Sequence, residues 1–255
     1  MGILSPGAVD YHLANQVGNL SINPQNPCSL TCWISAVINT STTMSMVGTY
    51  NTYTSGGTGI QMGTRSELSN GFTVWTWGGG HLVDTNNNAG GNLFTFTDNV
   101  WYHYAYVFDG TYNRLYINGN LINQVNNSTG VSVTTGATGY ASQLAGTITA
   151  VYVNGYPSGG TSETGTFSFT DISHFNRALS AQEVLSLYSI NGPRDGIIYG
   201  DVTSYFCGEK SIGSVANSVT DESGNGNLLT PLGAATGVNF TYVADNLSGD
   251  ARPPL

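Results

Sequence analysis

Three short runs of aromatic and β-branched residues, joined by two turn-forming dipeptides, constrain the fold of this chain more than any other feature. The runs occupy residues 101–108, 112–117 and 120–125, and the dipeptides are Asp109-Gly110 and Asn118-Gly119. Asp-Gly and Asn-Gly supply the positive φ angles that tight hairpin turns require. The segment is therefore predicted to form a three-stranded antiparallel meander.

The first run can be covered by apolar material on both faces, as in the middle of a packed sheet. Trp101, His103 and Ala105 alternate there with Tyr102 and Tyr104. The Trp-x-His strand, followed by Asp-Gly and then Leu-Tyr-Ile-Asn-Gly-x-Leu, resembles the central hairpin of laminin G-like domains. Those domains belong to the concanavalin A-like jelly-roll superfamily.

A second segment resembles the same family. Residues 165–175 are predicted to form a strand, and Asn-Arg-Ala-Leu-Ser at residues 176–180 leads into a short helix. Ser180 and Glu183 form a capping box, which satisfies backbone N–H groups at the helix start. The apolar residues of the helix are predicted to share one stripe, formed by Ala181, Val184, Leu185 and Tyr188.

The two segments extend the resemblance over residues 28–188 and imply the fold class. This is an all-β, concanavalin A-like (laminin G-like) jelly-roll sandwich with one short helix toward its C-terminal side. The composition agrees, because only 8% of residues are charged and 34 are glycine, as in a sandwich with many turns. We treat residues 1–255 as a single domain. Residues 194–255 are a tail expected to complete the sandwich or to contact a neighbour, since residues 221–230 resemble the stretch that opens a laminin G-like domain.

Further short strands are predicted at residues 28–34, 44–50, 59–64, 71–77 and 146–156. In the first of them, alternation places Leu30, Cys32 and Ile34 on one face and Trp33 on the other. Cys28 and Cys32 would then lie roughly 13 Å apart at the usual strand rise, too far for a mutual disulfide. Small buried thiols are the expected outcome, and the pairing of Cys207 is left open.

The charge of the chain excludes several partners. There are 15 acidic and 6 basic residues, and Lys210 is the sole lysine. Such a chain has no basic patch for nucleic-acid phosphates or for anionic lipid, and no apolar run long enough to cross a bilayer. The N-terminus lacks the pattern of a secretory signal. We therefore expect no nucleic-acid or membrane partner, and synthesis in a host cytoplasm.

Catalytic groups are not evident either. Glycosidases of this fold carry Glu-x-Asp-x-Glu on one strand, which supplies the two carboxylates that the reaction needs. None of the five glutamates begins that pattern: Glu67, Glu163, Glu183, Glu209 and Glu222. The four histidines are scattered, without metal-ligand spacing; His103 and His174 are expected to be core or half-buried residues. The chain is predicted not to be an enzyme.

Two binding sites are candidates. Trp75 and Trp77 share one strand face and could form a stacking platform for a sugar or an apolar partner, or they could fill the core. Asp84 with Asn86 and Asn88 has oxygens that suit calcium, as in some laminin G-like domains, although an ordinary exposed polar loop at residues 86–91 is the alternative. No other cofactor is expected.

These observations favour a non-enzymatic virion structural protein as the leading hypothesis. It would decorate a bacteriophage capsid or belong to a tail or fibre, reside in the virion, assemble with other virion proteins and form a homo-oligomer. It could also attach to surface glycans. The alternatives are a carbohydrate-binding lectin module and a glycosidase whose site has no recognised motif.

Overall fold

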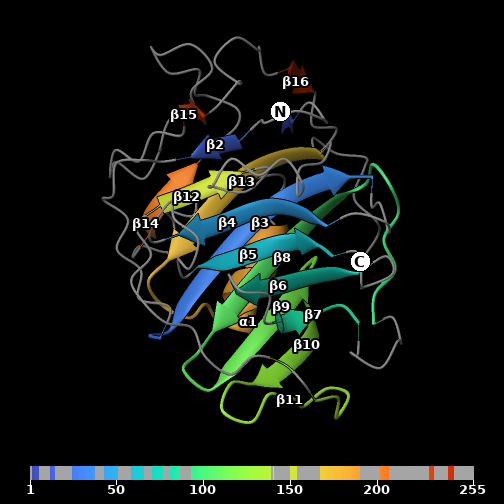
Figure 1. The fold of residues 1–255 in the computed structure, drawn as a ribbon, viewed down its shortest axis with the longest axis vertical. Helices are drawn as coiled ribbons and strands as arrows, with labels where there is room; N and C mark the ends of the chain where they lie inside the picture. Colours follow the sequence, from blue (N-terminus) through green and yellow to red (C-terminus); the bar gives the residue numbers. More distant parts are fainter. Residues whose placement is uncertain are drawn as a thin grey trace.

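The computed structural model describes residues 2–5, 12–14, 25–37, 43–50, 59–65, 71–76, 81–86, 93–138, 140, 150–153, 167–189, 202–206, 230–232 and 241–243. These residues form two antiparallel β-sheets that pack face to face, and one short α-helix (Figure 1). The predicted jelly-roll sandwich is confirmed.

One sheet has nine strands. They are β1 (Gly2–Ser5), β3 (Cys28–Ala36), β8 (Trp101–Phe108), β9 (Tyr112–Ile117), β10 (Asn120–Asn126), β11 (Val131–Ser132), β13 (Phe167–Phe175), β14 (Val202–Phe206) and β16 (Thr241–Val243). Their order is β11-β10-β9-β8-β3-β13-β1-β16, and β14 pairs with β13.

The other sheet has seven strands. They are β2 (His12–Ala14), β4 (Met44–Tyr50), β5 (Ile60–Thr64), β6 (Phe72–Thr76), β7 (His81–Asp84), β12 (Ala150–Val153) and β15 (Thr230–Leu232), in the order β15-β2-β12-β4-β5-β6-β7. The strand β7 was not predicted from the sequence. It is only four residues long and lies at the edge of the sheet.

The predicted meander is present as β8, β9 and β10, paired in sequence. Gly110 and Gly119 have φ angles of 94° and 78°, and Asn118 has a φ angle of 50°. Gly110 in the first turn, and both residues of the second dipeptide, therefore adopt the left-handed backbone that Gly and Asn tolerate. The Asn118 side chain also accepts a 2.9 Å hydrogen bond from the His103 backbone N–H, which fixes the second turn to β8.

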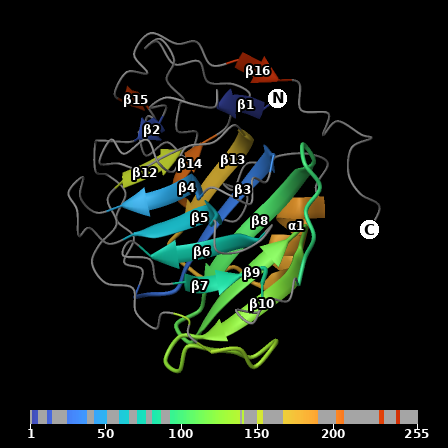
Figure 2. The same cartoon turned by 45° about the vertical axis from the view of Figure 1, so that its right-hand side comes forward.

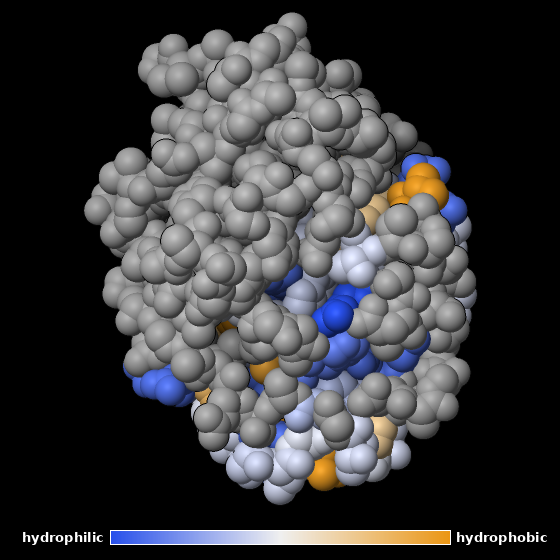
Figure 3. All heavy atoms as spheres, in the orientation of Figure 1, coloured by the Kyte–Doolittle hydropathy of each residue, from blue (hydrophilic) through white to orange (hydrophobic). Residues whose placement is uncertain are grey.

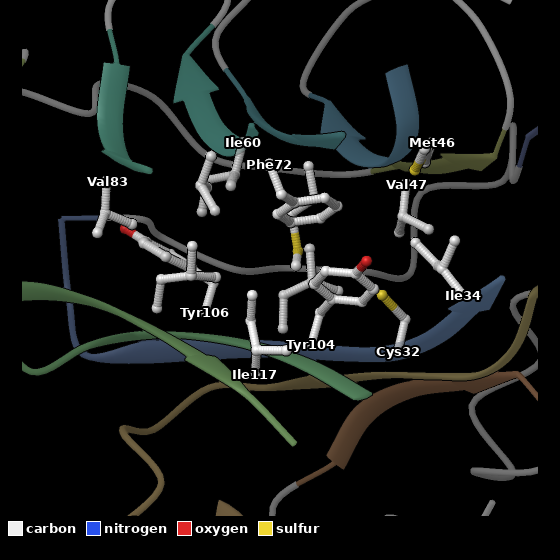
Figure 4. Packing of buried hydrophobic residues seen from close by; sticks show 14 of the residues in the cluster. Cys32, Ile34, Met46, Val47, Ile60, Phe72, Val83, Tyr104, Tyr106 and Ile117 are labelled. Atoms are coloured by element: carbon white, nitrogen blue, oxygen red, sulfur yellow. The ribbon is translucent and has the colours of Figure 1, made fainter. Parts of the chain in front are cut away.

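The core lies between the two sheets, and Figure 4 shows side chains from both meeting there. As predicted, Leu30, Cys32 and Ile34 face this core, whereas Trp33 packs in a separate cluster on the other side of β3. The rings of Phe72 and Tyr104 stack across the core with centroids 4.0 Å apart. Cys28 and Cys32 are buried free thiols, as expected, and Cys207 lies outside the described residues.

The helix α1 (Ala181–Ser189) packs on the outer face of the nine-stranded sheet (Figure 2). Its capping box is confirmed, because the Glu183 N–H donates to Ser180 Oγ and the Ser180 N–H donates to Glu183 Oε2. The predicted stripe is partly wrong. Ala181 is exposed and Leu185 is only half-buried, whereas Leu187 is buried with Val184 and Tyr188. The buried helical residues Val184 and Leu187 pack with Ala105, Val107 and Tyr116 of the sheet.

Strands from residues 194–255 extend both sheets. In the nine-stranded sheet β14 pairs with β13 and β16 with β1, and in the seven-stranded sheet β15 pairs with β2. The domain boundaries stay a prediction. Within the described residues, no helix has the length and apolarity needed to span a lipid bilayer.

Candidate functional site

The pairing of β6 with β7 brings the two predicted sites onto one sheet face. Thr73 pairs with Asp84, and Trp75 follows two residues later on β6 and pairs with His81. Residues two apart on a strand, and residues paired across antiparallel strands, share a face. Trp75 and Asp84 therefore lie on the same face, opposite the side of β6 that sends Val74 into the core.

Asp84 is completely buried, with an exposed fraction of 0%. Its Oδ1 atom accepts hydrogen bonds from the Asn86 N–H at 3.0 Å and the Tyr140 hydroxyl at 3.1 Å. Its Oδ2 atom has no hydrogen-bond donor among the described residues. The His81 Nδ1 atom lies 3.6 Å away, beyond hydrogen-bond distance. This buried oxygen therefore has the His81 ring nearby but no hydrogen-bond donor among the described residues.

Asn86 is also buried, with an exposed fraction of 5%, so the alternative of an exposed loop is wrong at this residue. The Thr85 hydroxyl accepts from the Phe72 N–H, which holds this segment against β6. A Cβ atom on Gly71 would lie 2.7 Å from Asn86 Oδ1, so a larger residue there would displace the Asn86 amide. Asn86 Oδ1 has no hydrogen-bond donor within the described part of the chain. Asn88 lies outside that part.

Three residues distant in sequence hold Asp84 in place. Asn123 on β10 donates to the Asp84 carbonyl at 3.0 Å and to the Tyr140 hydroxyl at 3.3 Å. Ser132 on β11 donates to Asn123 Oδ1 at 2.7 Å. Burial and the neighbouring Asp84 carboxylate raise the pKa of Tyr140 well above its ordinary value. The phenol therefore keeps the proton that it donates.

Trp75 is buried too, with an exposed fraction of 3%, and it does not belong to the core between the sheets. The Arg65 guanidinium lies 5.7 Å from its ring centroid. Gln61 pairs with Trp75 across β5 and β6 and is 1% exposed, and its Oε1 atom lacks a donor in the described residues. Figure 3 shows hydrophilic residues gathered in the middle of this side of the molecule. Trp77 lies outside the described residues.

The oxygen atoms of this site are of the kinds that coordinate a hard cation. Calcium prefers carboxylate and amide oxygens, and Asp84 Oδ2 and Asn86 Oδ1 are two such atoms, each buried and without a hydrogen-bond donor. The described residues contain no cluster of three or more His, Cys, Asp or Glu residues, so any cation here would complete its shell with carbonyl, water or ligand oxygens.

Glu183, His103 and His174 lie in structural settings. Glu183 pairs with Arg177 at 2.8 Å, and hydrogen bonds from Arg177 and Ser180, opposed by partial burial, lower the pKa of Glu183 to about 2. A carboxylate held ionised in this way is a poor proton donor. His103 and His174 are buried, as expected. Burial lowers the pKa of His103 to about 3.

The fold is a two-sheet jelly roll, and the candidate site combines the buried Trp75 ring with buried acceptor oxygens that lack a donor among the described residues. The profile of the "Concanavalin A-like lectin/glucanases superfamily" matches residues 10–185. The chain therefore belongs to this superfamily, through its laminin G-like branch. A comparison with curated protein sequences found no significant match.

Solved structures show the same fold at low sequence identity. A heptameric SAP-like pentraxin from Limulus polyphemus aligns with a TM-score of 0.53 and 14% identity, over 76% of this chain and 84% of the pentraxin chain. A Bacteroides ovatus protein to which carbohydrate binding has been ascribed aligns with a TM-score of 0.52 and 12% identity, over 91% of this chain and 60% of the other. A Trypanosoma rangeli sialidase aligns with a TM-score of 0.44 and 14% identity, over 64% of this chain and 23% of the sialidase.

Sequence reasoning missed most of the site. Gln61, Asn123, Ser132 and Tyr140 belong to no motif, and their types are common in β-proteins. Asn123 and Tyr140 reach Asp84 from 39 and 56 residues further along the chain. No local spacing could have linked them.

Proposed function

We propose that this protein is a non-enzymatic, lectin-like module that binds carbohydrate on the face formed by β5, β6 and β7. One observation carries the proposal. Three buried acceptor oxygens, on Gln61, Asp84 and Asn86, have no donor among the described residues. They lie on β5, on β7 and just after β7, the two strands that flank the β6 strand of Trp75. Buried polar atoms are normally paired, so these oxygens are suited to an incoming donor.

A saccharide has the complementary chemistry. Its hydroxyl groups donate hydrogen bonds to carboxylate and amide oxygens, and the apolar face of its ring stacks on an aromatic side chain. Binding sites commonly combine an apolar wall with a few converging polar groups. The superfamily includes lectins in its description, and the carbohydrate binding ascribed to the Bacteroides ovatus protein supports the same proposal.

We further propose that Asp84 Oδ2 and Asn86 Oδ1 hold a divalent cation such as calcium. When bound, the cation would supply positive charge for a ligand oxygen. The residues of this chain would orient it, because Tyr140 and the Asn86 N–H already occupy Asp84 Oδ1 and leave Oδ2 to a ligand. Outer hydrogen bonds of this kind commonly fix the orientation of metal ligands.

A glycan array with the full chain, in calcium chloride and in EDTA, tests both proposals. We expect binding that weakens in EDTA and that is lost in Trp75→Ala and Asp84→Asn. Asp98→Asn, which changes an exposed carboxylate, is the matched control and should bind like the wild type. An array without reproducible binding would refute the lectin proposal.

The variant Gln61→Leu tests whether the Gln61 side chain binds the glycan or has only a structural role. Removing an unpaired buried acceptor should stabilise the free protein by about 1–3 kcal/mol, because the unpaired acceptor carries a desolvation penalty. The same variant should bind glycan more weakly if Gln61 Oε1 accepts a hydrogen bond from it. Higher thermal stability with unchanged glycan binding would remove Gln61 from the proposed site.

The absence of hydrolysis is a second expected property of the same protein. Release of reducing sugar from any polysaccharide, abolished by replacement of a single Asp or Glu, would contradict the non-enzymatic proposal.

The virion role and the homo-oligomer also stay proposals. The acidic, nearly lysine-free composition supports the virion role, and the heptameric pentraxin fold supports an oligomer. Mass spectrometry of purified particles and light scattering test them.

A further inference from the structure

The Trp-x-His residues of β8 lie beneath the C-terminal end of α1. Trp101 and His103 are two residues apart, so they share the outer face of the nine-stranded sheet, and His103 pairs with Trp33 of β3. The His103 ring lies 5.3 Å from the Trp33 ring and 6.5 Å from the Tyr188 ring, centroid to centroid. Trp33, Trp101 and Tyr188 form one buried cluster, against which Leu185 packs. These five residues are called here the His103 cluster.

The His103 cluster holds a basic ring away from water. The His103 side chain is 2% exposed, and its Nδ1 atom has no hydrogen-bond partner among the described residues. The His103 backbone N–H donates to Asn118 Oδ1 at 2.9 Å, and its carbonyl accepts from the Asn118 N–H at 2.8 Å. The backbone of His103 is thus fixed to the second turn of the meander. The ring can reach water only if the residues above it move.

The titratable groups that face His103 in the described part of the chain are phenols. Tyr188 faces it from α1, and Tyr116 of β9 lies beside it, because Tyr116 pairs with Ala105 on the same sheet face. The next charged side chain along β9 is Arg114, which forms an ion pair with the carboxylate of the first turn. Burial lowers the pKa of His103 to about 3.

The two ends of α1 are held by different chemistry. At the N-terminal end, Ser29 Oγ donates to the Arg177 carbonyl and accepts from the Leu179 N–H, both at 3.0 Å. Glu183 adds the capping box and the ion pair with Arg177, and its pKa is lowered to about 2. At the C-terminal end the described contacts are those of the His103 cluster and of Gly119, on which a Cβ atom would lie 2.7 Å from Leu185 Cδ1.

We propose that protonation of His103 releases residues 185–189 of α1 from the sheet, while the N-terminal end of the helix stays attached and the two sheets stay folded. A buried charge without a partner is costly, so a protonated imidazole requires water. Among the described elements, α1 covers this part of the sheet (Figure 2). Its displacement hydrates the ring without breaking the pairing of β8 with β3 and β9. The released form exposes the rings of Trp33 and Trp101.

Proton linkage gives the size and the sign of the effect. In the released form the imidazole titrates near pH 6.5, whereas in the attached form its pKa is about 3. The attached form is therefore favoured most above pH 6.5, and it loses stability as the pH falls toward 3. The equilibrium constant for release should rise about 30-fold between pH 7.5 and pH 5.0. The Glu183 cap stays ionised over this range, so the N-terminal end should remain in place.

Amide hydrogen exchange of the full chain at pH 7.5 and 5.0 tests the proposal, with rates expressed as protection factors to remove the intrinsic pH dependence of exchange. The amides of residues 187–189 should lose about 30-fold in protection. At pH 5.0 they should be protected at least about tenfold less than the amides of Leu179 and Ala105. His103→Gln and His103→Phe, which do not titrate, should reduce the loss to less than about threefold. Tyr188→Phe removes the other titratable side chain of the cluster and should keep the loss seen in the wild type.

Three results would overturn the proposal. Protection of residues 187–189 that does not change between the two pH values would show that protonation does not release the helix. An equal loss in the wild type and in both His103 variants would remove His103 from the mechanism. Protection factors at pH 5.0 that are equal for residues 187–189, Leu179 and Ala105 would show that the helix opens only when the whole protein unfolds.

Discussion

Acidification should destabilise this protein in part through the buried imidazole of His103. His103 is 2% exposed, and its ring lies 5.3 Å from Trp33 and 6.5 Å from Tyr188, centroid to centroid. Its Nδ1 atom has no hydrogen-bond partner among the described residues. Burial lowers the pKa of His103 to about 3. The folded protein therefore keeps this ring neutral beside Trp33 of β3 and Tyr188 of α1.

The size of the effect follows from proton linkage. In the unfolded chain the imidazole titrates near pH 6.5, so between pH 6.5 and 3 the unfolded chain binds a proton that the folded protein does not. The free energy of unfolding should fall by about 1.4 kcal/mol for each pH unit below 6.5. Between pH 6.5 and pH 4.5 the His103 contribution is about 2.3 kcal/mol, because the unfolded imidazole is only half protonated at pH 6.5, and structural relaxation will relieve part of it.

Urea unfolding followed by tryptophan fluorescence at several pH values measures this contribution. Protonation of paired carboxylates also destabilises the protein at low pH. The useful quantity is therefore the difference in the free energy of unfolding between the wild type and His103→Phe. That difference should shrink or reverse as the pH falls. Tyr188→Phe alters a ring in the same cluster and should retain the wild-type slope. A pH slope that is equal in the wild type and in His103→Phe would refute the reasoning.

Three further outcomes concern stability and assembly. Leu187→Ala should lower the free energy of unfolding by about 2–4 kcal/mol, as for other buried leucines. Leu185→Ala should lower it less, because Leu185 is half-buried. Equal melting temperatures for the two variants would contradict the observed helix face. Ser180→Ala should cost about 1 kcal/mol through loss of the helix cap, and a melting temperature equal to that of the wild type would show that the cap contributes nothing. A chain ending at Ile190 lacks β14, β15 and β16 and exposes new strand edges, so it should aggregate in light scattering. A soluble, equally stable truncated protein would show that these strands are dispensable.

The meander and the capping box could be predicted because their signals are local. Asp109-Gly110 and Asn118-Gly119 set their own backbone angles, and Ser180 reaches Glu183 within one helical turn. The strand β7 could not be predicted in the same way. It has four residues at a sheet edge, and its formation depends on pairing with β6 rather than on its own periodicity.

The candidate site shows the same division between local and long-range information. Trp75 and Asp84 could be chosen from the sequence because aromatic rings and carboxylates near polar loops are recognisable residue types. Their placement on one face depends on the register of β6 against β7. The burial of Asp84 also depends on the tertiary structure, since Asn123 and Tyr140 approach it from elements distant in sequence.

The sequence by itself therefore determined the sandwich class, the turns of the meander and the capped helix, because alternation and turn chemistry act over a few residues. Only the tertiary structure decided which strands pair, which helical residues are buried, and which acceptor oxygens are left without a donor. Those properties depend on burial and on hydrogen bonds between segments far apart in the chain, for which a local pattern carries no signal.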